Sequence, residues 1–374
     1  MMIPFNKPYL SGKETAYIEQ AVKSGKISGN GAFTQKCQHF FQDKYGFKKC
    51  LLTTSCTDAL EMAAILINIK PGDEVIMPTY TFVSTALAFV RQGAFIKFVD
   101  SRADHPGMDE ESVESLITPK TKAIIVVHYA GVACNMDHIM QLAAKHKLWV
   151  VEDAAHAIDS FYKGKPLGGI GHLGCFSFHE TKNLQCGEGG MLVINHANFE
   201  KRAEIIWEKG TNRAEFFRGE VNKYGWVDIG SSFLPSEITA AFLWAQIENL
   251  DDIQRKRKQI WQQYYDRLKL LPEGLVRLPF IPDYSTNNAH NFYLLCHDIG
   301  QRTKLIAVLK KKDIYAVFHY LCLHRSEFYK PKHDGRSLPN SMYYEECLVR
   351  MPLYYELDQV GIEDILAIIN TSFL

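Results

Sequence analysis

Short apolar segments alternate with amphipathic segments through the first part of the chain. The apolar segments have the length and composition of buried strands, and the amphipathic ones have the length of crossover helices. The predicted strands are 73–78, 94–100, 122–129 and 148–153. The predicted helices are 57–69, 84–93 and 136–147. Because strands that alternate with helices form parallel sheets covered on both faces, we expect an α/β fold with a mostly parallel sheet sandwiched by helices.

The pattern changes at Pro235. A helical stretch over 235–271 contains no Gly and no further Pro, and it ends before "PEG". The segments that follow favour a smaller α+β unit, and they are 289–299, 303–314 and 362–373. We therefore expect a large domain of residues 1–250 and a small C-terminal domain of residues 251–374.

Composition and charge narrow the class of protein. The chain has 374 residues, of which 47% are hydrophobic, and Lys plus Arg balances Asp plus Glu at 42 each. There is no run of five or more like charges, no uninterrupted apolar stretch of 18 residues and no secretory N-terminal pattern. We expect no nucleic-acid and no membrane partner. The nine cysteines form no CxxC pair and their odd number cannot pair completely, which favours a reducing, cytoplasmic location.

One motif imitates a dinucleotide-binding site. Gly169, Gly171 and Gly174 match the pattern GxGxxG. That fingerprint requires a helix after the glycines, whereas "CFSFH" follows here and is typical of a strand. We expect a turn and a loop. The segment "HYLCLH" (319–324) offers two His and a Cys but lacks the second ligand pair of a structural zinc site, so we expect no metal and interpret it as a loop or edge strand facing a cleft.

Three further features are ambiguous when each is taken alone. Lys182, after "CFSFHET", is typical of a solvated surface cation but is also a possible nucleophile. Asp153 ends a predicted strand, where it serves as a cap, as a salt-bridge partner or as the anion for a cationic ring nitrogen, with His156 nearby. The hydroxyl groups of Thr54, Ser55 and Thr57 cap a helix or bind a phosphate at its start.

Together these features are what pyridoxal 5'-phosphate requires. The cofactor needs an amine for its aldehyde, an anion beside its pyridine nitrogen, donors for its phosphate and an aromatic ring for stacking. Lys182, Asp153 and the helix start near Thr57 supply the first three. Ser177 is a further phosphate donor, and Phe82, at the end of another strand, is a possible stacking ring.

The chain resembles the DegT/DnrJ/EryC1/StrS family of sugar aminotransferases through "VVEDAAHA", "GCFSFHETKN" and "GEGG", in this order and spacing. The similarity extends from "IPFNKPYLSGKE" to "RMPLYYEL". It implies the type I fold of pyridoxal-phosphate-dependent transferases, which is that of aspartate aminotransferase. It also implies roles for seven residues: Lys182 forms the Schiff base, Asp153 contacts the pyridinium nitrogen, His156 lies beside the phenolic oxygen, Phe82 stacks, and Ser177, Thr57 and the Cys56 backbone bind the phosphate.

Two positions depart from the family pattern. Cys56 stands where many relatives have Gly, which leaves the backbone less free to approach the phosphate. Ser232 stands where many relatives offer an Asn to the phosphate in the neighbouring subunit, and Ser reaches less far. The resemblance implies a homodimer with shared active sites.

The resemblance also implies a reaction. The amino group of L-glutamate is transferred to C4 of dTDP-4-dehydro-6-deoxy-D-glucose, giving 2-oxoglutarate and dTDP-4-amino-4,6-dideoxy-D-galactose for surface polysaccharide such as lipopolysaccharide. Residues expected to bind the sugar and the diphosphate are Lys209, Arg213, Arg218, His319, Tyr320 and His324.

The sequence leaves open a different transamination and a role other than catalysis. One is a transaminase that acts at C3 or gives the gluco epimer, and another is a non-catalytic cofactor-binding regulator. A dehydratase of the same fold is disfavoured because that branch resembles this chain with His in place of Lys182.

Overall fold

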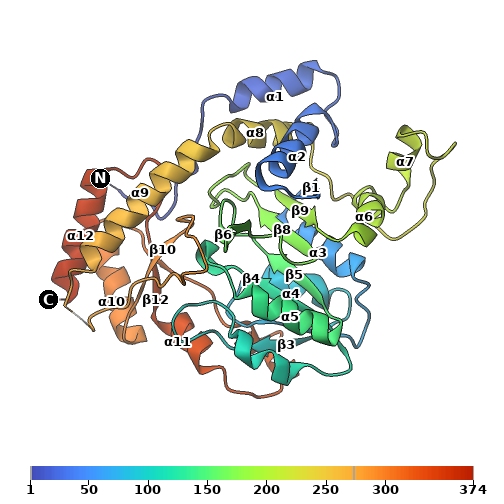
Figure 1. Ribbon diagram of the computed structural model, residues 1–374. Coiled ribbons are helices and arrows are strands. Elements are labelled where there is room, and N and C mark those ends of the chain that lie inside the picture. The colour runs from blue at the N-terminus through green and yellow to red at the C-terminus, as the bar shows by residue number, and fades with distance from the viewer. Residues whose placement is uncertain (1, 273, 374) are drawn as a thin grey trace.

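The structure is a computed structural model that describes residues 2–272 and 274–373. Its centre is a seven-stranded sheet in which β9 runs antiparallel to both neighbours and the other strands run in one direction (Figure 1). In spatial order the strands are β1 (Lys49–Thr53), β9 (Gly190–Ile194), β8 (Leu173–Ser177), β5 (Trp149–Asp153), β4 (Thr121–Val127), β2 (Glu74–Pro78) and β3 (Phe95–Val99). The predicted mostly parallel sheet is confirmed.

Helices cover both faces of this sheet, because successive strand residues point to opposite sides. In β4, Ile124 belongs to the core on one face and Ile125 to the core on the other. The first face is covered by α2 (Ala32–Tyr45), α5 (Met136–His146) and α8 (Glu237–Ile247), and α1 (Glu14–Lys23) packs on α8. The second face is covered by α3 (Cys56–Leu66), α4 (Val83–Val90) and α6 (Glu200–Trp207).

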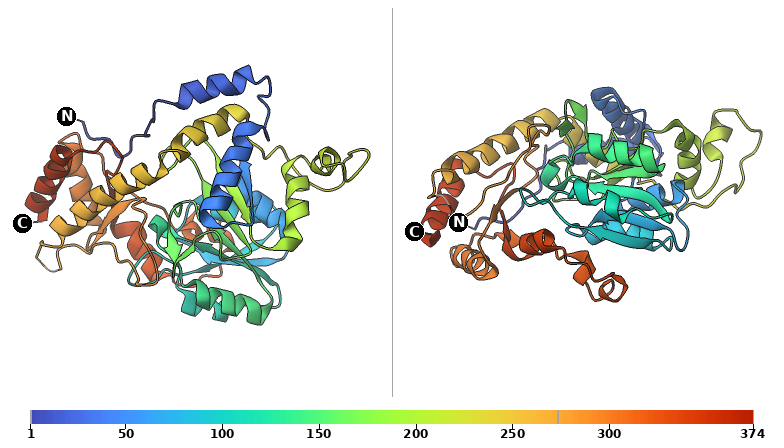
Figure 2. Two further views of the ribbon diagram at one scale, coloured as in Figure 1. Left: turned by 45° about the horizontal axis from the view of Figure 1, so that its top comes forward. Right: turned by 60° about the horizontal axis from the view of Figure 1, so that its bottom comes forward.

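A smaller antiparallel sheet, in the order β10-β12-β11, forms from the C-terminal part of the chain. Its elements and their helices are α9 (Leu250–Leu268), β10 (Phe292–Leu295), α10 (Ile299–Lys310), β11 (Val317–Phe318), α11 (Pro339–Cys347), β12 (Leu348–Met351) and α12 (Gln359–Phe373). Ile3, near the start of the chain, packs into the hydrophobic core that these elements form. Figure 2 shows the orange and red helices α10 and α12 on the side opposite the short helix α7 (Arg213–Phe217). The domain limits themselves stay a prediction.

The helical stretch over 235–271 is two helices. α8 ends at Ile247 and α9 begins at Leu250, with Glu248 and Asn249 between them. The Asn249 side chain donates a 2.9 Å hydrogen bond to the carbonyl oxygen of Ala245. This amide competes with the backbone for the carbonyl, as is typical of Asn at helix ends.

The glycine-rich segment is a loop followed by a strand, as predicted. The N–H groups of Gly168 and Ile170 each donate a 2.7 Å hydrogen bond to the Glu152 carboxylate. Nε2 of His128 lies 2.9 Å from the same carboxylate. The donors that a dinucleotide would need are therefore used by the chain's own Glu152. Within residues 2–272 and 274–373, no helix has both the length and the apolar character needed to cross a bilayer.

Candidate active site

A cavity of about 670 Å³ lies at the carboxyl ends of β4, β5 and β8, where open α/β sheets bind ligands. Residues that are far apart in sequence meet there because the strands end at one edge of the sheet. The cavity is lined by nine of the predicted site residues, which are Cys56, Thr57, Phe82, Asp153, His156, Ser177, Lys182, His319 and Tyr320.

Lys182 lies in the loop between β8 and β9, where it lines the cavity. Among the described residues its amine has neither a hydrogen-bond partner nor an ion-pair partner. Burial, together with the nearby charge of Arg350, lowers the pKa of Lys182 from its ordinary value to about 8, although Cys56 and Asp153 oppose the shift. The amine is therefore available as a nucleophile and base near neutral pH.

Asp153 ends β5 and is 5% exposed. The Thr85 hydroxyl donates a 2.6 Å hydrogen bond to one carboxylate oxygen, and the Ala155 N–H donates a 3.1 Å bond to the other. Burial raises the pKa of Asp153, whereas both hydrogen bonds and the charge of Lys182 lower it. No described Lys, Arg or His side chain forms an ion pair with it, so this buried acid lacks the cation that a protonated ring nitrogen would supply.

The start of α3 provides donors for an anion. The Ser55 hydroxyl caps the helix by accepting from the Asp58 N–H, and the first-turn N–H groups of Cys56 and Thr57 have no intrahelical acceptor. The Thr57 hydroxyl donates to Ser84 at 2.8 Å. A Cβ at Gly190 would lie 2.4 Å from the Ser55 carbonyl carbon, which explains a glycine at this position.

Aromatic side chains form the remaining wall. Nδ1 of His156 accepts a hydrogen bond from the Ala130 N–H, so Nε2 carries the proton in the neutral ring and donates to the Tyr320 hydroxyl at 3.3 Å. The His156 ring stacks on His290, with 4.0 Å between the centroids. Burial lowers the pKa of both histidines well below the ordinary value, so both are neutral.

Phe82 lies at the mouth of this wall. It precedes the first turn of α4 and is 55% exposed, although Phe is usually buried. Its ring lies 6.1 Å from that of Tyr320. An exposed aromatic face at a cavity is suited to stacking on a flat ring.

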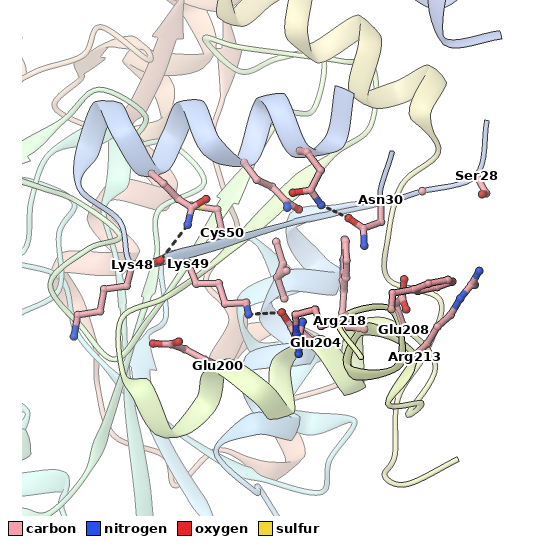
Figure 3. Close-up of a pocket in the computed structure, with 18 of the residues that line it drawn as sticks. Ser28, Asn30, Lys48, Lys49, Cys50, Glu200, Glu204, Glu208, Arg213 and Arg218 are labelled. Atoms are coloured by element: carbon pink, nitrogen blue, oxygen red, sulfur yellow. Dashed lines mark hydrogen bonds and ion pairs between the residues drawn. The ribbon is translucent and has the colours of Figure 1, made fainter. Parts of the chain in front are cut away.

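Five predicted site residues do not line this cavity in a single chain. Lys209 and Ser232 are exposed, and His324 is buried with its Nδ1 2.8 Å from the Thr79 hydroxyl. Arg213 and Arg218 line a second cavity between α2 and α6 (Figure 3).

Ion pairs lie along the wall of that second cavity. Figure 3 shows Lys49 and Arg218 near Glu204, and the distances to its carboxylate are 2.5 and 2.9 Å. Arg218 also pairs with Glu220 at 2.6 Å. Its charge is therefore largely compensated within the chain.

Three further residues line the first cavity and were not predicted from the sequence, namely Thr85, His290 and Arg350. Arg350 had a signal, because it is a charged residue inside the apolar strand "LVRMPL". Thr85 lies one turn after Phe82, and His290 has no local signature, so only the tertiary structure identifies these two.

A model of the DegT/DnrJ/EryC1/StrS aminotransferase family matches residues 8–370. The chain belongs to this family. The spore coat polysaccharide biosynthesis protein SpsC of Bacillus subtilis (strain 168) is 31% identical over 374 residues, which cover 97% of this chain and 95% of SpsC.

Solved structures of other aminotransferases have the same fold. The aminotransferase TlmJ from Streptoalloteichus hindustanus superposes with a TM-score of 0.91 at 26% identity, covering 100% of this chain and 99% of TlmJ. The PLP form of Spr1654 from Streptococcus pneumoniae has a TM-score of 0.91 at 25% identity, covering 100% of this chain and 98% of Spr1654. A PMP form of Spr1654 is also known. The protein is therefore a pyridoxal-phosphate-dependent sugar aminotransferase with the type I fold.

The donor set of the first cavity fits this cofactor. The unpaired amine of Lys182 supplies an attachment point for the aldehyde, and the buried carboxylate of Asp153 supplies a partner for the ring nitrogen. The start of α3, with its free N–H groups, supplies a phosphate site. The family membership also implies an amino donor and a keto sugar as substrates.

Proposed function

We propose that the protein transfers the amino group of L-glutamate to C4 of dTDP-4-dehydro-6-deoxy-D-glucose. The products are 2-oxoglutarate and dTDP-4-amino-4,6-dideoxy-D-galactose, a precursor of surface polysaccharide. The observation that carries the reaction type is the unpaired amine of Lys182 in one cavity with the buried carboxylate of Asp153.

The cofactor would be held by residues of this cavity. Lys182 would supply the amine for its aldehyde, Asp153 the anion for its ring nitrogen, His156 a partner for its phenolic oxygen, and Phe82 an aromatic face for its ring. Its phosphate would be bound by Ser177, Thr57 and the N–H of Cys56, with Ser232 contributed by the neighbouring subunit. When bound, pyridoxal 5'-phosphate supplies a carbonyl group and an electron-withdrawing ring.

Lys182 moves the protons of both half-reactions. Its neutral Nζ accepts the proton from Cα of glutamate, and in the second half-reaction Nζ delivers a proton to C4 of the sugar. A single lysine delivers that proton from one side only, so the orientation of the bound sugar decides the epimer. A negative charge on Asp153 favours the protonated ring throughout.

The sugar substrate is supported by resemblance and by cavity chemistry. The segments "FHETKN", "KGTNRAEFFRG" and "AVFHYLCLH" resemble the branch that acts at C4 with galacto stereochemistry. SpsC is named for spore coat polysaccharide biosynthesis, which supports a role in surface sugars. His319 and Tyr320 line the cavity and are the favoured sugar contacts within one chain. Amination at C3 or the gluco epimer is the alternative.

We further propose a cytoplasmic homodimer. All nine cysteines lie in the described part of the chain and are free thiols, which suits a reducing compartment. In a dimer, the exposed side chains of Lys209 and Arg213 would be available to the substrate of the neighbouring subunit, whereas Arg218 would first have to leave its ion pairs with Glu204 and Glu220.

The structure of the product distinguishes amination at C4 from amination at C3, and the galacto from the gluco epimer. The purified protein with pyridoxal 5'-phosphate, glutamate and dTDP-4-dehydro-6-deoxy-D-glucose should give a sugar whose C4 proton shows small couplings to its ring neighbours, as an axial amine requires. Large couplings, or nitrogen at C3, would contradict the proposed substrate and epimer. Lys182→Ala protein is the matched control and should give no amino sugar.

A further inference from the structure

His290 lies just before β10 and lines the cavity that holds Lys182. The residue is 3% exposed, and its ring stacks on that of His156. Arg257 holds its backbone by donating to the carbonyl oxygens of Ala289 at 3.1 Å and His290 at 2.7 Å. The ring is therefore fixed at the wall of the active site, although the cofactor contacts proposed for this cavity do not include it.

The hydrogen bonds of Asn183 decide which ring nitrogen of His290 carries the proton. The amide nitrogen of Asn183 donates to the side-chain oxygen of Gln254 at 2.7 Å and to the carbonyl oxygen of Asn288 at 2.9 Å. A backbone carbonyl only accepts, so this end of the amide is the nitrogen and the other end is Oδ1. Oδ1 lies 3.0 Å from Nδ1 of His290. Because an amide oxygen only accepts, Nδ1 must carry a hydrogen.

Nε2 of His290 is consequently a hydrogen-bond acceptor. Burial lowers the pKa of His290 well below its ordinary value, so the ring is neutral and its single N–H is the one at Nδ1. Among the described residues this Nε2 has no hydrogen-bond partner. His156 has the opposite tautomer, because its Nδ1 accepts from the Ala130 N–H and its Nε2 donates to Tyr320. The stacked pair thus combines one acceptor with one donor.

We propose that Nε2 of His290 accepts a hydrogen bond from the keto sugar, from the hydroxyl group on the carbon beside the reacting carbonyl. Glutamate brings carboxylates, which only accept, and an amine that the reaction consumes, whereas a keto sugar brings hydroxyl groups that donate. Lys182 is near enough to influence the pKa of His290, which supports a position of the ring close to the reacting carbon. With the substrate proposed above this hydroxyl is the one at C3, and that detail rests on the proposed function.

The assignment makes His290 a determinant of sugar specificity. A buried acceptor disfavours a substrate that lacks the matching donor, because the acceptor then stays unpaired. His290 should therefore favour sugars with a hydroxyl group at this carbon over deoxy sugars. It should be used in the sugar half-reaction and not in the glutamate half-reaction.

The tautomer can be observed in the holoenzyme before any substrate is added. With ¹⁵N-labelled histidine, proton–nitrogen NMR spectra distinguish protonated from unprotonated ring nitrogens, and His290→Asn identifies the resonances of His290 by their loss. We expect a hydrogen on Nδ1 and none on Nε2. His172 is the internal reference, because its Nδ1 accepts from the Val150 N–H at 2.9 Å and its hydrogen is expected on Nε2. A hydrogen on Nε2 of His290 would overturn the assignment.

The sugar contact is tested by following the absorbance of the bound cofactor in each half-reaction. His290→Asn keeps an amide at the place of Nδ1 and can still donate to Asn183, but it has no atom at the place of Nε2. Wild type should react about tenfold faster with dTDP-4-dehydro-6-deoxy-D-glucose than with its 3-deoxy analogue, as expected for one hydrogen bond. His290→Asn should react about tenfold more slowly than wild type with the first sugar and should not distinguish the two.

Glutamate provides the control within each protein. The rate constant of the glutamate half-reaction in His290→Asn should stay within about threefold of wild type. His290→Gln, whose amide reaches the place of Nε2, should recover part of the sugar reaction. His172→Asn, at a partly buried histidine outside the cavity, is the matched control protein.

Two kinetic results would also overturn the assignment. They are undiminished discrimination between the two sugars by His290→Asn, and equal slowing of both half-reactions in that variant. If wild type does not aminate this sugar although NMR shows the expected tautomer, the proposed substrate fails and the C3 contact with it, while the acceptor on His290 stands.

Discussion

At the scale of single residues, the electrostatics of Lys182 govern the chemistry. An amine with a pKa of about 8 is neutral in about one molecule in ten at pH 7, whereas an ordinary lysine is neutral in about one in 2,500. Because the lowered pKa arises chiefly from burial in the cavity, the reactivity depends on the fold and not on the local sequence.

We therefore expect a characteristic pH profile for Lys182 in the cofactor-free protein. Trace labelling with acetic anhydride, read by peptide mass spectrometry, should rise about tenfold per pH unit up to pH 8 and then level off, because only the neutral amine reacts. The exposed Lys165 serves as the internal reference for the reagent. A rise that continues without a break to pH 10 would show that the pKa of Lys182 is not lowered.

At the scale of elements, the site residues that lie at the ends of strands could be predicted from the sequence. Asp153 and Ser177 end apolar runs, and parallel strands end at one edge of a sheet, so their proximity could be predicted. The loop at Gly169 was also predictable, because a strand follows the glycines where a dinucleotide-binding motif requires a helix.

Other features of the elements depend on contacts between distant segments. Glu237 of α8 is buried and accepts hydrogen bonds from the N–H groups of Gly31, Phe33 and Thr34, which caps α2 across about 200 positions. Neither segment contains a sequence pattern that predicts this contact. Arg350 is an intermediate case: its charge inside an apolar strand is visible in the sequence, but its lack of a partner among the described residues appears only in the packed structure.

At the scale of the whole molecule, one segment extends away from the body. Figure 1 shows α7 and the loop after it projecting from α6. Its side chains include Phe217 and Trp226, which are 70% and 86% exposed in the single chain. Large exposed apolar side chains commonly mark contacts between proteins, which supports the proposed homodimer with Ser232 contributed to the neighbouring site.

The shared site can be tested by mixing two inactive proteins. Lys182→Ala removes the amine, and Ser232→Glu places a negative charge where the cofactor phosphate of the neighbouring subunit is expected. If subunits re-assort randomly, half of the dimers are mixed and each has one intact site, so about one quarter of wild-type activity should return. Each variant alone, taken through the same unfolding and refolding, is the control. No recovery in demonstrably mixed dimers, or full activity of isolated monomers, would contradict shared sites.

The central claim is that Lys182 carries the cofactor in the cavity at the strand ends. The direct measurement is reduction of the cofactor-loaded protein with sodium borohydride, followed by peptide mass spectrometry to locate the modified lysine. We predict that the pyridoxyl group is attached to Lys182 and that Lys182→Ala protein, correctly folded by circular dichroism, remains unlabelled. Attachment at another lysine, or normal transamination by Lys182→Ala protein, would contradict the account.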